Sequence, residues 1–227
     1  MPSERYLLGM RRRYPRAVRS RSAFAVLVLV LVGCGSSQAS SRSRAQAAGD
    51  GCGPASARTL AADSVARIYD TGASVYGCST TSRRRFRLGS SSSSLREGRV
   101  GPVALAGAEA AYGLAFHSVD TGSAEVVVRR LTDGKVLHTA AAISRPAGPE
   151  SFGSVTALVV KGDGAVAWIG EGSSIVGRGH EIEVHRLDSR GQAELDHGAG
   201  IAPSSLRRHR SRLTWAHSGR QRTATLR

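Results

Sequence analysis

From residue 55 onward, apolar residues come in short runs separated by Gly, Ser, Asp and Thr, and no stretch keeps a helical period over three turns. Short alternating runs with turn-forming residues between them are typical of β-strands, whereas an amphipathic helix needs a longer apolar stripe. The sequence therefore predicts an all-β domain over residues 55–227.

The runs repeat four times. In each repeat an apolar strand leads into a strand with a central aromatic residue, and a further strand follows. These aromatic residues lie 36, 56 and 47 residues apart, close to the roughly 40–50 residues of a four-stranded propeller blade. Their place inside apolar strands favours core packing over a carbohydrate-stacking row. They are Tyr76, Tyr112, Trp168 and Trp215.

Two repeats turn sharply into a fourth strand, at Leu131–Leu137 and Leu187–Ala193. An Asp-Gly pair suits the first turn because Gly accepts positive φ without steric cost. The strand-turn-strand at 129–137 resembles the outer hairpins of quinoprotein-type propeller repeats, and the whole domain resembles exported bacterial lipoproteins with propeller-like repeats. The resemblance implies a β-propeller-like fold of about four blades, and it assigns no cofactor or catalytic residue.

The predicted ring is incomplete. Ser90–Ser94 stands where the first repeat needs its fourth strand, and the fourth repeat has no residues left for one. We expect Arg58–Ala61 to pair beside the last repeat and close the ring, because closure removes exposed sheet edges. An irregular β-sandwich is the alternative fold.

Residues 1–34 have the pattern of an export signal. Six arginines between residues 11 and 21 precede about ten apolar residues, a run too short to span a hydrocarbon core of about 30 Å at about 1.5 Å per helical residue. The motif Leu31–Cys34 resembles the lipobox of bacterial lipoproteins, although Val32 stands where Ala or Ser is commoner. The resemblance implies that Cys34 carries a lipid and anchors an extracytoplasmic protein to the membrane.

Two alternatives to lipid anchoring stay open. A plain secretory signal would be cleaved later, after Ala45–Ala47, where small residues flank Gln46. An uncleaved membrane anchor is the second alternative. Met10 is also a candidate start, since it would give an ordinary Arg-rich opening.

Residues 35–54 predict a flexible tether, since they hold almost no large apolar side chain. With Cys34 set apart, Cys52 and Cys78 remain as a pair, and in an exported chain such a pair predicts a disulfide. The bridge would close a loop of about 25 residues, worth about 3–4 kcal/mol in the loop-entropy model. The absent C-x-x-C spacing argues against a metal site, and a catalytic thiol has no partner pattern here.

The formal net charge is +15, of which +9 lies beyond residue 34. The Arg bias reflects either GC-rich coding or attraction to a polyanion. An exported chain meets little nucleic acid, so we expect no nucleic-acid partner. The strongest cluster forms either a solvated turn or a site for an envelope polyanion, and it consists of Arg207, Arg208, His209, Arg210 and Arg212, followed by Trp215.

The sequence predicts no cofactor, no metal and no catalytic residue, because it holds no H-E-x-x-H, G-x-S-x-G, P-loop or dinucleotide motif. Glu181, Glu183 and His185 would share one face of a strand and could hold a metal, but a solvated polar face is the plainer interpretation. A secreted hydrolase or lyase would need a site assembled from scattered residues. The only candidates for such a site are Asp63, Asp120, Asp163 and His185.

The favoured function is therefore a non-enzymatic binding or scaffolding module that is tethered to a membrane outside the cytoplasm. Its expected partner is an envelope protein or an anionic polymer. A structural envelope protein, held by charge to an anionic polymer, is the further alternative.

Overall fold

A computed structural model describes residues 52–93, 97–145, 148, 150–174 and 179–227. These residues form strands and turns and no helix, which confirms the predicted all-β class. The strands form three sheets, of eight, four and three strands, and none of these sheets closes into a barrel.

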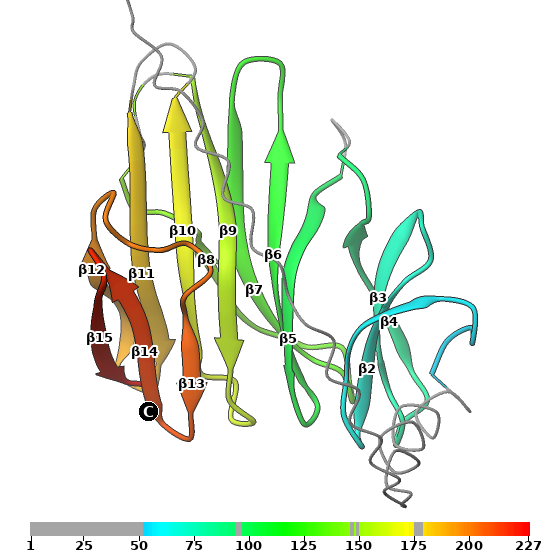
Figure 1. Cartoon of the computed structure of the whole chain (residues 1–227). Helices are drawn as coiled ribbons and strands as arrows, with labels where there is room; N and C mark the ends of the chain where they lie inside the picture. Colours follow the sequence, from blue (N-terminus) through cyan, green and yellow to red (C-terminus); the bar gives the residue numbers. More distant parts are fainter. Residues whose placement is uncertain (1–51, 94–96, 146–147, 149, 175–178) are drawn as a thin grey trace, which may run out of the picture. The chain divides into compact units, whose positions relative to one another are not determined.

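The eight-stranded sheet follows chain order and consists of two antiparallel meanders (Figure 1). A single parallel bridge, from Ser90 to Arg99, joins them. The first meander contains β1 (Arg58–Ala62), β2 (Ala66–Asp70), β3 (Ser74–Ser79) and β4 (Arg85–Ser90), and the second contains β5 (Arg99–Ala106), β6 (Glu109–His117), β7 (Gly122–Arg130) and β8 (Val136–Ala141).

The other two sheets are also antiparallel meanders in chain order. The third meander has four strands and the fourth has three. The third contains β9 (Ser151–Val160), β10 (Val166–Ser174), β11 (His180–Asp188) and β12 (Gly191–His197), and the fourth contains β13 (Arg207–His209), β14 (Arg212–His217) and β15 (Arg220–Thr225).

The second strand of every meander carries a buried aromatic residue, but in the first meander this residue is Tyr69 on β2 and not Tyr76. Tyr76 lies on β3, directly opposite Tyr69, and the two rings stack with centroids 5.6 Å apart. Both tyrosines lie in short strands of similar composition, so spacing alone could not separate them. The aromatic residues of the second strands are Tyr69, Tyr112, Trp168 and Trp215.

The prediction that Arg58–Ala61 pairs beside the last repeat is wrong. These residues form most of β1, which pairs antiparallel with β2 across a short turn. A short hairpin closes at a smaller entropic cost than a pairing across most of the chain. The Asp63 carboxylate stabilises this turn by accepting the N–H groups of Val65 and Ala66. The first meander is therefore complete, with β4 as its fourth strand.

Successive meanders pack face to face through three apolar clusters. Glycines allow close approach: a Cβ at Gly113 on β6 would lie 2.8 Å from Cβ of Val155 on β9, and one at Gly77 on β3 would lie 2.6 Å from the side chain of Leu131. The second-strand aromatic residue of each later meander belongs to the cluster shared with the preceding meander. Tyr112 belongs to the cluster between the first and second meanders, Trp168 to the cluster between the second and third, and Trp215 to the cluster between the third and fourth.

Candidate functional site

The predicted lipid attachment site, Cys34, and the export signal lie outside the described residues. Among the strands and turns that the structure does describe, no helix could cross a membrane.

Cys52 and Cys78 form the predicted disulfide. Both are buried and pack with Tyr69 and Tyr76. The guanidinium of Arg67 lies 5.1 Å from the centre of the Tyr69 ring and donates to the carbonyl of Cys52. On the first meander, this cluster covers the face that a preceding meander would cover, so the disulfide closes one end of the described stack.

The prediction of a solvated polar face is wrong for Glu183 and His185, because both side chains are buried. Glu183 Oε2 lies 2.6 Å from His185 Nε2, and neither side chain is more than 2% exposed. The N–H and hydroxyl of Ser144 donate to the same oxygen at 2.7 and 2.8 Å, and the N–H of Arg145 donates to Oε1 at 2.9 Å. Within the described ranges, no group of three His, Cys, Asp or Glu side chains is placed to hold a metal.

Glu183 instead acts as a charged anchor between meanders. Burial alone would raise its pKa, but the hydrogen bonds from Ser144, His185 and Arg145 outweigh burial and hold the pKa below its usual 4.5. The imidazole of His185 also stacks on Trp168, with ring centres 5.1 Å apart. These contacts fasten the segment after β8 to β11.

The serine in this cluster is not placed as a nucleophile. A Ser-His-acid arrangement needs the hydroxyl to face the imidazole, which then takes its proton. The Ser144 hydroxyl donates to the Glu183 carboxylate instead. The cluster therefore does not support the hydrolase interpretation.

The remaining catalytic candidates serve separate turns. Besides its own turn, Asp63 accepts the N–H of Gly107 at 2.8 Å. Asp163, between β9 and β10, accepts the N–H of Ala165 and pairs with Lys161 at 2.7 Å. Asp120 is exposed between β6 and β7. In the described parts of the chain, no hydrogen bond or ion pair joins any two of these aspartates, or any of them to His185.

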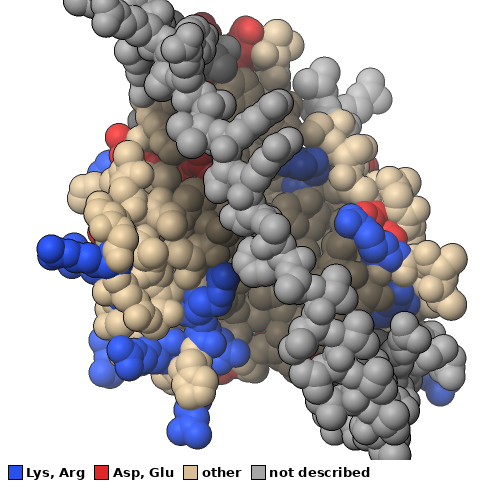
Figure 2. Space-filling view, in the orientation of Figure 1, with Lys and Arg blue, Asp and Glu red and all other residues tan. Residues whose placement is uncertain are grey.

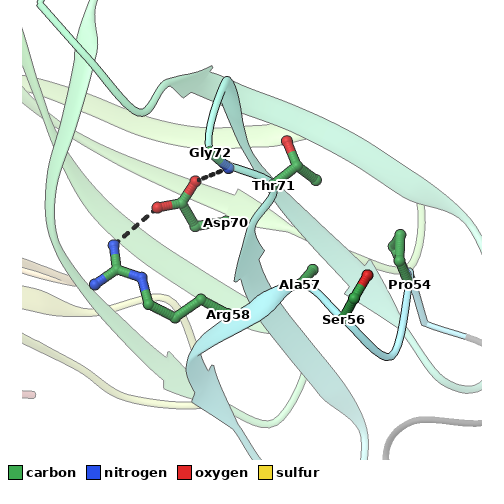
Figure 3. A pocket seen from close by; sticks show the side chains of 7 residues that line it. All are labelled: Pro54, Ser56, Ala57, Arg58, Asp70, Thr71 and Gly72. Carbon is green, nitrogen blue, oxygen red and sulfur yellow. Dashed lines mark hydrogen bonds and ion pairs between the residues drawn. The ribbon is translucent and has the colours of Figure 1, made fainter.

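A pocket of about 320 Å³ lies beside the turn between β2 and β3 (Figure 3). Its one acidic residue is Asp70, which accepts from Arg58 at 2.8 Å, from the N–H of Gly72 at 2.8 Å and from the hydroxyl of Ser91. These hydrogen bonds, that of Ser91 foremost, hold the pKa of Asp70 below its usual value. Both carboxylate oxygens are engaged, so Asp70 stabilises the turn and is not free to act as a base or metal ligand.

The fourth meander carries a surface of exposed arginines. Figure 2 shows Lys and Arg side chains gathered at the lower left, where Figure 1 places β13–β15. Asp196 is the last acidic residue of the sequence, and seven arginines follow it. We call the six that lie on these strands and the turn between β13 and β14 the arginine surface: Arg207, Arg208, Arg210, Arg212, Arg220 and Arg222.

No carboxylate of a described residue pairs with the arginine surface. Arg207 donates to the carbonyls of Ser204 and Leu206, and Arg208 donates to that of Arg210, each at 2.8 Å. Some arginines elsewhere in the molecule do pair with acids, as Arg186 does with Asp188 and Arg87 with Glu97, although the exposed Arg83, Arg84 and Arg85 pair with no described carboxylate. Guanidinium groups that no described carboxylate neutralises suit a partner with carboxylate or phosphate groups, which they can hold through paired hydrogen bonds.

Two tight hairpins hold the arginine surface in place. The turn after β13 contains Arg210 at φ 55°, and the turn after β14 contains Ser218 and Gly219 at φ 50° and 73°. In the second turn, positive φ at both central residues, Ser218 and Gly219, matches the type I′ turn, whose twist suits an antiparallel strand pair.

Asp196 on β12 fixes the inner side of the fourth meander. Its Oδ2 accepts the indole N–H of Trp215 at 2.7 Å and contacts His217 Nδ1 at 2.9 Å. Burial would raise the pKa of Asp196, but these hydrogen bonds outweigh burial and hold the pKa below its usual value. The nearest acid in sequence is thus engaged with core side chains and not with the arginines.

Sequence reasoning found the first four arginines of this surface but not Arg220 and Arg222. The second hairpin places these two residues opposite His217 and Trp215 on β14, so they share a face of the sheet with Arg208, whereas Arg207 and Arg212 lie on the other face. The missed signal was the lack of any acid after Asp196. Trp215 itself is buried, as the core interpretation of the aromatic row predicted.

Compared with known protein families and with curated proteins, the chain matches none.

Proposed function

We propose that this protein is an extracytoplasmic binding module that is tethered to a membrane through Cys34 and holds an anionic partner on its arginine surface. The observation that carries the proposal is the set of six exposed arginines that no described carboxylate neutralises. Uncompensated charge on one sheet attracts an oppositely charged partner and steers its approach.

The disulfide supports the extracytoplasmic part of the proposal. Disulfides persist in oxidising compartments and are rare in the cytosol. The Cys52–Cys78 bond is buried against two tyrosines, and it is compatible with an extracellular location. The export signal and lipobox pattern of residues 1–34 supply the membrane tether in this proposal.

A propeller-like arrangement is the proposed basis of the module. Supporting it, each meander presents its second-strand aromatic residue toward the meander before it or, in the first meander, toward the disulfide cluster. A β-sandwich buries one interface between two sheets, whereas three successive clusters separate these meanders. Repeated faces of this kind offer broad surfaces for partners, which is an analogy from fold.

The proposal is tested by binding of the full-length protein, in non-ionic detergent, to immobilised poly-glutamate. We expect retention in about 0.1 M salt and release toward about 1 M, because the screening length falls from about 10 Å to about 3 Å. The triple variant Arg208→Gln, Arg210→Gln, Arg212→Gln should bind about tenfold more weakly, a loss of about 1.4 kcal/mol.

A matched control removes the same charge elsewhere. Arg83, Arg84 and Arg85 are exposed on the first meander, and Arg83 has positive φ as Arg210 does. Their replacement by glutamine should leave retention close to that of the unaltered protein. Equal losses in both triple variants would show that net charge alone governs binding and would refute the proposed surface.

A structural envelope protein held by charge to an anionic polymer is the second candidate, because the same unpaired arginines favour it. Detergent extraction of envelope fractions prepared from cells distinguishes these two candidate functions. A polymer-bound structural protein would stay with the polymer after the membrane is dissolved in detergent, whereas a lipid-tethered module would be released.

A further inference from the structure

The fourth meander lacks a fourth strand among the described residues. The other three meanders each have four strands, and in each the third strand pairs with a fourth. β15 pairs only with β14. The residues after β15 do not cover its other edge: the N–H of Leu226 donates to Ser211, and the N–H of Arg227 donates to Asp188. The outer edge of β15 is therefore open in the described structure.

The hairpin register shows which residues present their backbone to that edge. Arg220 closes the two-residue turn opposite His217, so its backbone polar groups face β14. Leu226 lies an even number of residues after Arg220, and its N–H likewise points toward the β14 side, where it donates to the carbonyl of Ser211 at 2.8 Å. The residues that alternate with these, Gln221 and Thr223 among them, therefore direct their N–H and C=O groups to the open edge.

The side chains at this edge favour pairing with a negatively charged strand. Arg220 and Arg222 share one face of β15 and are exposed. A basic edge strand resists pairing with neutral or basic strands, and a second copy of this arginine-bearing edge would meet like charge. An acidic strand gains cross-strand ion pairs at the same positions.

We infer that the open edge of β15 binds an extended acidic peptide segment of a partner protein, which adds antiparallel to β15 as the fourth strand of this meander. The inference rests on the proposed function and names its partner class. Main-chain hydrogen bonds from Gln221 and Thr223 would supply the pairing, and acidic residues at every second position would face Arg220 and Arg222.

The test uses a fluorescent ten-residue peptide of alternating valine and glutamate and the full-length protein in non-ionic detergent. In the inferred pairing, glutamates lie opposite Arg220 and Arg222 and turn their own N–H groups away from β15, while valines lie opposite Gln221 and Thr223 and turn theirs toward it. We expect N-methylation of the valines to weaken binding at least tenfold, as measured by anisotropy. N-methylation of the glutamates should change binding less than threefold.

A protein variant gives a second arm. Thr223→Pro removes an N–H that faces the open edge and none that faces β14, a position where edge strands tolerate proline. It should bind the peptide at least tenfold more weakly, while Thr223→Val, which keeps the N–H, should bind normally. Retained poly-glutamate binding by the proline variant would show that it is folded and that its arginine surface is intact.

Three outcomes overturn the inference. Equal binding of both N-methylated peptides would show attraction by charge alone, which leaves the proposed function standing. If the unaltered protein bound neither the peptide nor poly-glutamate, both the inference and the proposed function would be refuted. Self-association of the protein that Thr223→Pro abolishes, detected by sedimentation, would show that a second copy occupies the edge.

Discussion

At the scale of single residues, two buried or half-buried carboxylates hold neighbouring segments together. Glu183 ties the segment after β8 to β11, and Asp196 ties β12 to β14. In both, hydrogen bonds outweigh burial, so the pKa lies below its usual value. A carboxylate with a lowered pKa stabilises the fold while it is ionised, and it loses that contribution on protonation.

Replacing Glu183 by glutamine should destabilise the protein by about 1–3 kcal/mol at pH 7, because the amide keeps only one acceptor oxygen for the donors of Ser144 and Arg145 and carries no charge. The ionised form favours the native state, so its contribution is complete above the unfolded pKa near 4.5 and is lost as pH falls through the lower native value. The stability gap between the variant and the unaltered protein should therefore narrow below pH 4.5. Urea unfolding, followed by tryptophan fluorescence at pH 7 and at a pH below 4.5, measures this difference in stability.

The control for that prediction is Asp120→Asn at an exposed turn, which should change stability little at either pH. A gap for Glu183→Gln that stays constant into acid would contradict the assigned role of the charge.

At the scale of elements, the molecule is a series of local meanders that pack through small residues. Within each meander, every strand pairs with its neighbour in sequence, and glycines on one meander receive bulky side chains of the next. Gly77 on β3 faces Leu131, which is fully buried in the turn after β7. Packing between meanders therefore depends on matched volumes, as in any dense protein interior.

Gly77→Ala and Leu131→Ala should show strong coupling. The first variant overpacks the contact and should cost about 1–3 kcal/mol, and the second leaves a cavity and should cost about 2–5 kcal/mol. In the double variant the added methyl group fills part of the cavity, so the loss should be clearly smaller than the sum of the two. Equilibrium urea unfolding of the four proteins measures the coupling, and additive losses would refute this contact.

At the scale of the whole molecule, the two ends of the described stack are finished differently. The Cys52–Cys78 cluster covers the outer side of the first meander, while the fourth meander ends in exposed arginines and an open strand edge. One end is thus covered by the disulfide cluster, and at the other end the outer edge of β15 pairs with no described strand.

Replacing Cys34 by serine should release the protein from the membrane fraction, because it removes the thiol that the proposed lipid would modify. Mass spectrometry of the unaltered protein should show an acylated N-terminal cysteine at this position. Thiol alkylation without reductant should leave Cys52 and Cys78 unlabelled, as the disulfide requires. Membrane retention of the serine variant would contradict lipid anchoring, and labelling of both later cysteines would contradict an oxidising location.

The amino-acid sequence by itself determined the all-β class, the position of most strands and the Cys52–Cys78 pairing. These features depend on local alternation, turn residues and the small number of cysteines. It misplaced the aromatic residue of the first meander, because Tyr69 and Tyr76 lie in similar strands and only the pairing register distinguishes them.

Only the tertiary structure decided the long-range contacts. Three features depend on which strands become neighbours. They are the pairing of β1 with β2, the burial of Glu183 with its hydrogen bonds from Ser144, and the position of Arg220 and Arg222 beside β14. The same alternating pattern is compatible with several registers and neighbours. Burial and charge neutralisation are properties of the packed neighbours, so local sequence does not specify them.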